Sequence, residues 1–131
     1  MTGDAVHAGP RFGVDARREA QAEVFTLAGE LDHDTAPMLR KRFDEAFELV
    51  ETAKAAGRER PDLVVVDCAE LAFCDSTGLN VLLTARLRAE ELGIEIRLAA
   101  LRGHVARMFE ITGVGGVFSI HSDLADALAA G

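Results

Sequence analysis

The segment Asp75-Ser76-Thr77-Gly78, in the middle of the chain, places the hydroxyl group of Ser76 among residues that commonly begin helices. An apolar, strand-like run at residues 63–67 precedes this segment, and an apolar stretch with helical spacing follows it. Ser76 is therefore predicted to begin a helix at the carboxyl end of a sheet strand. Unpaired backbone N–H groups and the positive end of the helix dipole favour a negatively charged group there. The chemistry that suits Ser76 is phosphorylation.

A purely structural role for Ser76 is the alternative, because serine is a preferred N-cap residue of helices. Two neighbours weaken this alternative. Asp75 can already cap the helix, and Gly78 in the first turn costs about 1 kcal/mol relative to alanine. A glycine is expected there if another backbone or a bulky group must approach closely. Thr77 offers a second hydroxyl and is the competing phosphate acceptor.

Three acidic residues, Glu30, Asp32 and Asp34, follow the second predicted strand. They can simply compensate the dipole of the next helix, at about 0.3–1 kcal/mol per residue. In a βα fold, however, successive strand ends gather at one edge of the sheet, where sites form. We therefore expect Asp32 to lie near Asp75 and Ser76 on one acidic, hydroxyl-bearing rim.

Catalytic machinery around the serine is missing from the sequence. The flanks of Ser76 do not form Gly-x-Ser-x-Gly, and His33 and His104 are interpreted as exposed polar or capping residues. The glycine-rich residues 113–116 lack the lysine and the long following helix of a phosphate-binding loop. Metal-ligand spacings are also missing. We expect a protein that is not an enzyme and that binds no cofactor and no metal.

Size and charge narrow the class of protein further. The chain has 131 residues, a formal net charge of −8 and a pI near 4.9. One domain is expected, and the acidity argues against nucleic acid and anionic membranes as partners. No apolar run approaches the roughly 20 residues that span a bilayer, and the start lacks signal-peptide features, so a cytoplasmic protein is expected. Cys68 and Cys74 are predicted to be small buried apolar residues.

Strands that alternate with helices predict an α/β domain over residues 11–131, after a flexible tail over residues 1–10. An N-terminal hairpin and βαβ crossovers give a mixed central sheet with about four helices. The predicted strands cover residues 12–17, residues 23–28 up to Gly29, and residues 63–67, 95–100 and 117–120.

The helices are placed by caps and by apolar spacing. The first begins near Asp34 or Thr35 and stops at Gly57, the second begins at Asp75 or Ser76, the third is closed by Gly113, and the last is capped by Ser122. The predicted core faces are Leu79, Leu82, Leu83 and Leu87 in the second helix, and Val105, Met108, Phe109 and Ile111 in the third.

Two motifs together resemble the bacterial anti-sigma factor antagonists, which are single STAS domains. They are residues 29–36, Gly-Glu-Leu-Asp-His-Asp-Thr-Ala, and residues 71–79, Leu-Ala-Phe-Cys-Asp-Ser-Thr-Gly-Leu. The resemblance implies that a kinase phosphorylates Ser76, the serine after the aspartate, and that Glu30 and Asp32 help to dock this kinase. The partner-binding residues expected on this basis are Glu30, Asp32, Asp34, Asp75, Ser76, Thr77, Gly78 and Asn80. The chain departs from the family pattern in a longer loop over residues 54–61 and in Asn80, where glycine is frequent.

The resemblance also implies a mechanism of partner switching. The unphosphorylated protein would bind an anti-sigma factor that is itself an ATP-dependent serine kinase, and a sigma factor would be released for transcription. A serine phosphatase would reverse the modification. The alternative is a non-switching STAS adaptor in a signalling assembly or a transporter-associated complex, in which Ser76 is only structural. Nucleotide binding by the domain itself has little sequence support, and the oligomeric state is left open.

Overall fold

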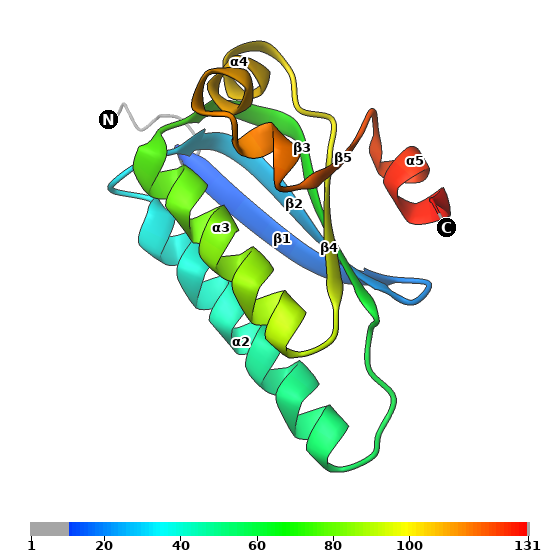
Figure 1. Ribbon diagram of the computed structural model, residues 1–131. Coiled ribbons are helices and arrows are strands. Elements are labelled where there is room, and N and C mark those ends of the chain that lie inside the picture. Colours follow the sequence, from blue (N-terminus) through cyan, green and yellow to red (C-terminus); the bar gives the residue numbers. More distant parts are fainter. Residues whose placement is uncertain (1–10, 131) are drawn as a thin grey trace, which may run out of the picture.

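A five-stranded mixed sheet organises residues 11–130, the part of the chain that the computed structural model describes (Figure 1). The strands lie in sequence order: β1 (Phe12–Glu19), β2 (Ala22–Leu31), β3 (Leu63–Cys74), β4 (Glu95–Ala99) and β5 (Ser119–His121). β1 pairs antiparallel with β2, and the later neighbours pair in parallel. The predicted α/β class, with its hairpin and βαβ crossovers, is confirmed. The tail predicted for residues 1–10 lies outside the described residues.

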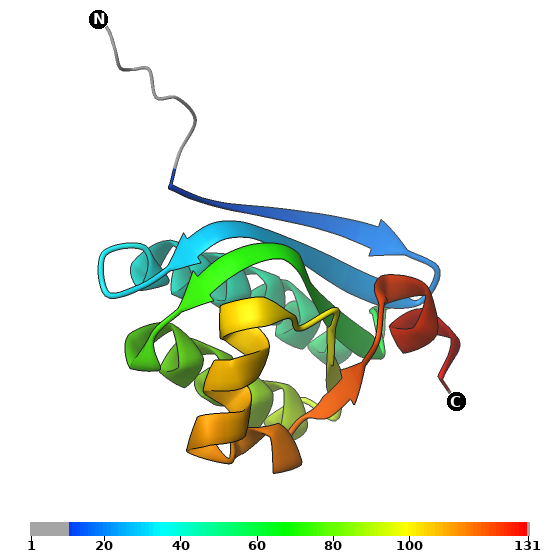
Figure 2. The same cartoon turned by 90° about the horizontal axis from the view of Figure 1, so that it is seen from above.

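Helices cover both faces of this sheet. Within residues 11–130 they are α2 (Ala36–Ala55), α3 (Ser76–Glu91), α4 (Gly103–Thr112), the short 3-10 helix η1 (Val114–Gly116) and α5 (Leu124–Ala129). α2 and α3 lie side by side against one face, and α4 lies near the carboxyl end of β3 (Figure 1, Figure 2). α5 covers part of the other face, where Ala127 joins a small cluster with Val24 and Val65.

The side chains of β3 alternate between these two layers. Val64 and Val66 belong to the large core beneath α2 and α3, whereas Val65 belongs to the small cluster beneath α5. All three are buried. A central strand that is covered on both faces has no polar side, which explains the continuous apolar run in its sequence.

Both central strands run further than the sequence predicted. β2 does not end at Gly29 but continues to Leu31. Gly29 adopts a φ of 90° at an irregularity in the pairing, and the strand passes through it. A Cβ added to Gly29 would lie 1.9 Å from the carbonyl oxygen of Arg11, so only glycine fits at this position. β3 continues beyond Asp67 to Cys74, which still pairs with Leu31 of β2. The prediction that these strands end at residues 29 and 67 was wrong.

The prediction that Leu87 and Ile111 belong to the core was also wrong. The buried face of α3 includes Leu79, Leu82 and Ala85, and Leu87 falls outside this stripe with 56% of its surface exposed. On α4, Val105 and Phe109 are buried, whereas Ile111 is 74% exposed. Neither residue keeps the three- or four-residue spacing of its helix's buried face.

Helix ends agree with the sequence in part. Gly113 ends α4 in the left-handed conformation with a φ of 76°, as predicted. The cap of α5 is Asp123, whose side chain accepts a hydrogen bond from the N–H of Asp126, and not Ser122. Thr35 is the N-cap residue of α2, but its side chain makes no capping bond. The strand predicted for residues 117–120 is shorter, since Val117 and Phe118 form a turn after η1 and β5 begins only at Ser119.

Candidate functional site

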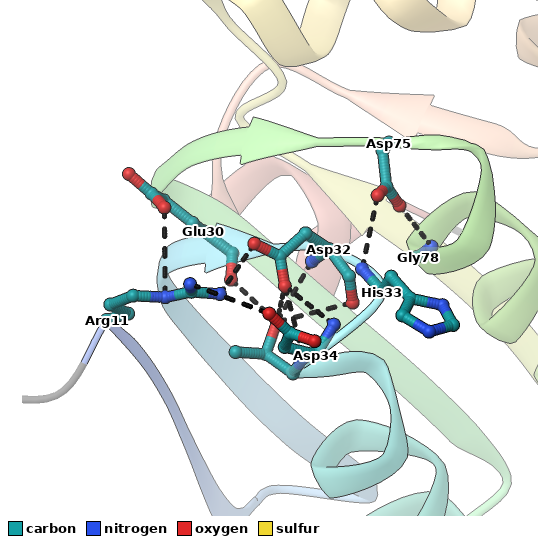
Figure 3. A network of polar contacts seen from close by, with 8 residues as sticks. Arg11, Glu30, Asp32, His33, Asp34, Asp75 and Gly78 are labelled. Carbon is teal, nitrogen blue, oxygen red and sulfur yellow. Dashed lines mark hydrogen bonds and ion pairs between the residues drawn. The ribbon is translucent and has the colours of Figure 1, made fainter.

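Asp75 joins the two segments that the sequence singled out (Figure 3). One oxygen of its carboxylate accepts a 3.0 Å hydrogen bond from the N–H of Gly78 and so caps α3. The other oxygen accepts a 3.1 Å bond from the N–H of His33, and the Asp75 N–H donates to the Leu31 carbonyl at 3.1 Å. The loop after β2 and the first turn of α3 are therefore held together by one side chain.

Ser76 is the first residue of α3, and its side chain is exposed. Among residues 11–130 its hydroxyl makes no hydrogen bond, and Asp75 caps the helix instead. Asn80 lies one turn further on the same face of α3 and is also exposed, whereas Thr77 is half-buried. The structural alternative for Ser76, a helix cap, is not what this geometry shows.

Gly78 is buried and serves the fold rather than the surface. A Cβ at this position would lie 2.5 Å from Cγ and 2.9 Å from the carbonyl oxygen of Leu31. The expectation that a bulky group approaches this glycine is confirmed, and the group is Leu31 at the end of β2. Gly78 therefore shapes the candidate partner surface without itself forming part of it.

The acidic loop after β2 is closed by Asp32 and Thr35. The Thr35 hydroxyl donates to the Glu30 carbonyl at 2.8 Å and accepts from the Asp32 N–H at 2.9 Å. One oxygen of Asp32 accepts from the backbone N–H groups of Asp34 and Thr35 at 3.0 and 3.1 Å. Desolvation alone would raise the pKa of Asp32, but the bonds from Thr35, the charge of Arg11 and the Asp34 N–H together lower it. Asp32 is therefore held as a carboxylate.

Arg11 is the residue of this site that the sequence interpretation missed. Its guanidinium lies 2.6 Å from the Asp32 carboxylate and 3.9 Å from each of the Glu30 and Asp34 carboxylates (Figure 3). Its carbonyl oxygen accepts the Glu30 N–H at 2.7 Å. The hairpin register, with Phe12 opposite Gly29, is the signal that could have placed Arg11 here. The rim is acidic, as expected, but one arginine partly neutralises it.

A second missed contact lies at the same edge of the sheet. The Phe73 ring, at the end of β3, stacks on the His104 ring of α4 with centroids 4.7 Å apart and planes inclined by 6°. His104 is thus engaged in a stack, and the backbone of His33 is engaged with Asp75. In the described part of the chain, no group of three or more metal-ligating side chains is arranged to hold a metal ion.

The two cysteines beside the motif are buried free thiols, as predicted. Burial, together with the charges of Asp67 and Cys74, raises the pKa of Cys68 far above its usual range. Burial and the neighbouring Asp75 carboxylate raise the pKa of Cys74 to about 12. Both side chains stay protonated near neutral pH and are poor nucleophiles.

The sequence profile of a family described as the STAS domain matches residues 14–127 of the chain. A protein named anti-sigma F factor antagonist, from Paenibacillus polymyxa, is 29% identical over 105 residues, which are 80% of this chain and 82% of that protein. An anti-sigma-B factor antagonist from Listeria monocytogenes is 31% identical over 94 residues, 72% of this chain and 74% of that protein.

Solved structures share the fold. The crystal structure of an anti-sigma factor antagonist from Mycobacterium paratuberculosis superimposes with a TM-score of 0.74 over 89% of this chain and 91% of that one, at 22% identity. At this identity the likeness concerns the fold alone. Among the described residues, no helix combines the length and the apolar character needed to cross a membrane.

Proposed function

Because the chain belongs to the STAS domain family, we propose that it acts as an anti-sigma factor antagonist that is switched off by phosphorylation of Ser76. Unphosphorylated, it binds an anti-sigma factor that is also a serine kinase, and a sigma factor is released. In this cycle the chain is the substrate of a kinase in the cytoplasm and of a serine phosphatase, and it catalyses no step itself. The names of its relatives support the antagonist role.

The proposal rests mainly on the hydroxyl of Ser76, which is exposed and makes no hydrogen bond within residues 11–130. Asp75 caps α3, so the fold does not require the neighbouring hydroxyl, which is exposed at the carboxyl end of β3. A kinase must reach an acceptor hydroxyl without unfolding its substrate, and Ser76 meets this condition better than the half-buried Thr77.

A phosphate on Ser76 adds about −1.5 to −2 charges at neutral pH. The N-terminus of α3 tolerates this charge, because its free N–H groups and its dipole favour an anion. The surrounding surface already carries Glu30, Asp32 and Asp34. A partner that fits this surface when Ser76 is neutral meets added bulk and negative charge after phosphorylation, so the interface weakens while the fold survives.

The proposed partner surface consists of exposed residues on a fixed base. Glu30, Asp34, Ser76 and Asn80 are exposed and are proposed to contact the anti-sigma factor. Asp32, Asp75 and Gly78 hold the loop and the helix start in place, through the contacts with Arg11, His33 and Leu31. Thr77 lies between these two groups.

Incubation with the cognate kinase and ATP, followed by phosphosite mapping, tests the proposal. We expect one phosphate on Ser76, none on the Ser76→Ala variant, and unchanged modification of Thr77→Val. Modification of Thr77 in the wild type would overturn the assignment of the acceptor. Binding of the kinase without any phosphorylation would instead favour the non-switching adaptor.

A further inference from the structure

A pocket of about 260 Å³ lies at the opposite end of β3 from Ser76. It is formed by the last turns of α2, the turn end of the β1–β2 hairpin, and residues 58–61, which lead into β3 (Figure 1). Its apolar lining consists of Ala46, Phe47, Leu49, Val50, Ala53, Pro61 and Val64. None of these side chains offers a hydrogen bond.

One apolar residue of this pocket is conspicuously open to solvent. Phe47, Val50 and Val64 form a buried floor, whereas Leu49 is 73% exposed. An apolar ligand that covered Leu49 would remove its surface from water, which is favourable in proportion to the area covered. An apolar chain on this floor would therefore gain from contact with Leu49.

The polar residues of the pocket lie at its rim and are mostly cationic. Arg18 pairs with Glu23 at 3.3 Å, so these two charges compensate each other. Arg58 and Arg60 make no ion pair with any of residues 11–130, and Glu59 between them offsets one of their charges. The rim thus keeps an excess of positive charge beside the apolar floor, although the chain as a whole has a net charge of −8.

We propose that this pocket binds a linear aliphatic carboxylate of medium length, such as a fatty acid. The tail lies on the apolar floor beside Leu49, and Arg58 and Arg60 hold the carboxylate. The planar guanidinium fork matches a carboxylate in two-point contact. A sugar or a nucleobase would leave its polar groups unpaired on this floor. The pocket volume of about 260 Å³ lies just below the roughly 300–1,000 Å³ that is typical of ligand pockets, which favours a short chain.

Titration of the full chain with decanoate tests this site by calorimetry and by NMR of the methyl groups of Ala46, Ala53 and Val64. We expect saturable one-site binding with shifts confined to the methyl groups that line the pocket, those of Leu49 and Val50 included. The double variant Arg58→Gln/Arg60→Gln is expected to weaken decanoate binding about tenfold or more. Decanol, which lacks the charge, serves as the matched ligand, and its affinity is expected to be equal for both proteins.

Leu49→Glu places a negative charge beside the tail site at an already exposed position, so the fold should persist, and decanoate binding should be lost. Melting temperatures of all variants check the fold. The proposal is overturned if decanoate fails to saturate below about 1 mM. It is also overturned if the two arginine substitutions leave the affinity unchanged, or if an acidic peptide displaces decanoate more effectively than octanoate does. Phosphorylation of Ser76 plays no part in any of these outcomes.

Discussion

Asp75 and Ser76 are neighbours in sequence with separate tasks. Asp75 accepts hydrogen bonds from Gly78 and His33, and so fixes both segments of the site. The Ser76 hydroxyl is exposed and has no structural bond within residues 11–130. This division lets the serine change its charge without loss of the helix start.

Replacement of Asp75 by alanine should therefore destabilise the protein, whereas Ser76→Ala should not. Asp75→Ala removes the cap of α3 and leaves the His33 N–H without its partner, a loss of about 1–2 kcal/mol in the free energy of unfolding. Urea denaturation measures both variants, and Ser76→Ala is expected within about 0.5 kcal/mol of the wild type. Equal losses in the two variants would contradict the separation of tasks.

The lowered pKa of Asp32 predicts a pH dependence of stability. Its carboxylate is bound in the folded state by Thr35, Arg11 and Asp34, so the folded pKa lies below the ordinary value of 3.8. The unfolded chain then takes up the proton first. The stabilisation is complete above the unfolded pKa and is lost as the pH falls through the folded pKa.

Denaturation of the wild type and of Asp32→Asn from about pH 6 to about pH 2 checks this sign. The stability of the wild type should fall more steeply on acidification than that of Asp32→Asn. Asp44→Asn, on the exposed side of α2, is the matched control and should follow the wild type. A wild type and an Asp32→Asn variant with the same slope would refute the role of the carboxylate.

The contacts within one helical turn of the site were predictable from the sequence, whereas the contacts between distant residues were not. The cap at Asp75 and the need for glycine at Gly78 follow from preferences within one helical turn. The ion pair of Arg11 with Asp32 joins residues 21 positions apart through the hairpin register, which no local pattern contains. The same holds for the contact of Gly78 with Leu31.

At the scale of elements, α3 approaches the end of β2 because Gly78 has no side chain. Gly78→Ala would gain about 1 kcal/mol of helix propensity. The new Cβ would meet the buried Leu31 at 2.5 Å, and overpacking of this kind costs typically 1–3 kcal/mol. Since one of the close atoms belongs to the backbone, we expect the clash to win and the variant to be less stable in urea.

Asn80→Ala is the matched control for this substitution, because it is exposed on the same helix. It should change the free energy of unfolding by less than about 0.5 kcal/mol. A Gly78→Ala protein that is more stable than the wild type would show that α3 can move away from β2 and that Gly78 does not need to pack closely against Leu31.

The turn of the β1–β2 hairpin contains a strained residue. Ala20 adopts a φ of 55°, a left-handed conformation that costs a non-glycine residue roughly 1–2 kcal/mol. Ala20→Gly relieves this strain but loosens the unfolded chain, so a net gain of about 0.5–1 kcal/mol is expected in thermal or urea unfolding. Gln21→Gly, next to it and without a positive φ, should instead lose stability. A loss in both variants would contradict the turn geometry.

The order and type of the elements were predictable, whereas several ends were not. Alternating apolar patterns and helical spacing reflect one-sided burial, which each segment records by itself. The continuation of β2 to Leu31 and of β3 to Cys74 depends on their mutual pairing across an irregularity at Gly29. Leu87 is exposed because it lies outside the buried stripe of Leu79, Leu82 and Ala85, and its apolar character alone did not show this.

At the scale of the whole molecule, the proposed partner surface and the proposed ligand pocket occupy opposite ends of β3. Ser76 follows the last residue of this strand by two positions, and the pocket includes Val64 near its start. Between them the sheet carries α2 and α3 on one face and α5 on part of the other, with buried apolar side chains on both sides (Figure 2). A change of charge at Ser76 is therefore expected to alter the surface at one end without a change of fold.

The switch at Ser76 is tested by the affinity of the cognate anti-sigma factor for three forms of this protein: with Ser76 free, with Ser76 phosphorylated, and as Ser76→Ala. We expect equal affinity for the free protein and Ser76→Ala. Phosphorylated protein should bind roughly 100-fold more weakly, since the phosphate on Ser76 would lose water and repel the partner at the interface. Its melting temperature should stay close to that of the free form. Equal affinity of the phosphorylated and free forms would rule out the switch at Ser76, and so would unfolding on phosphorylation.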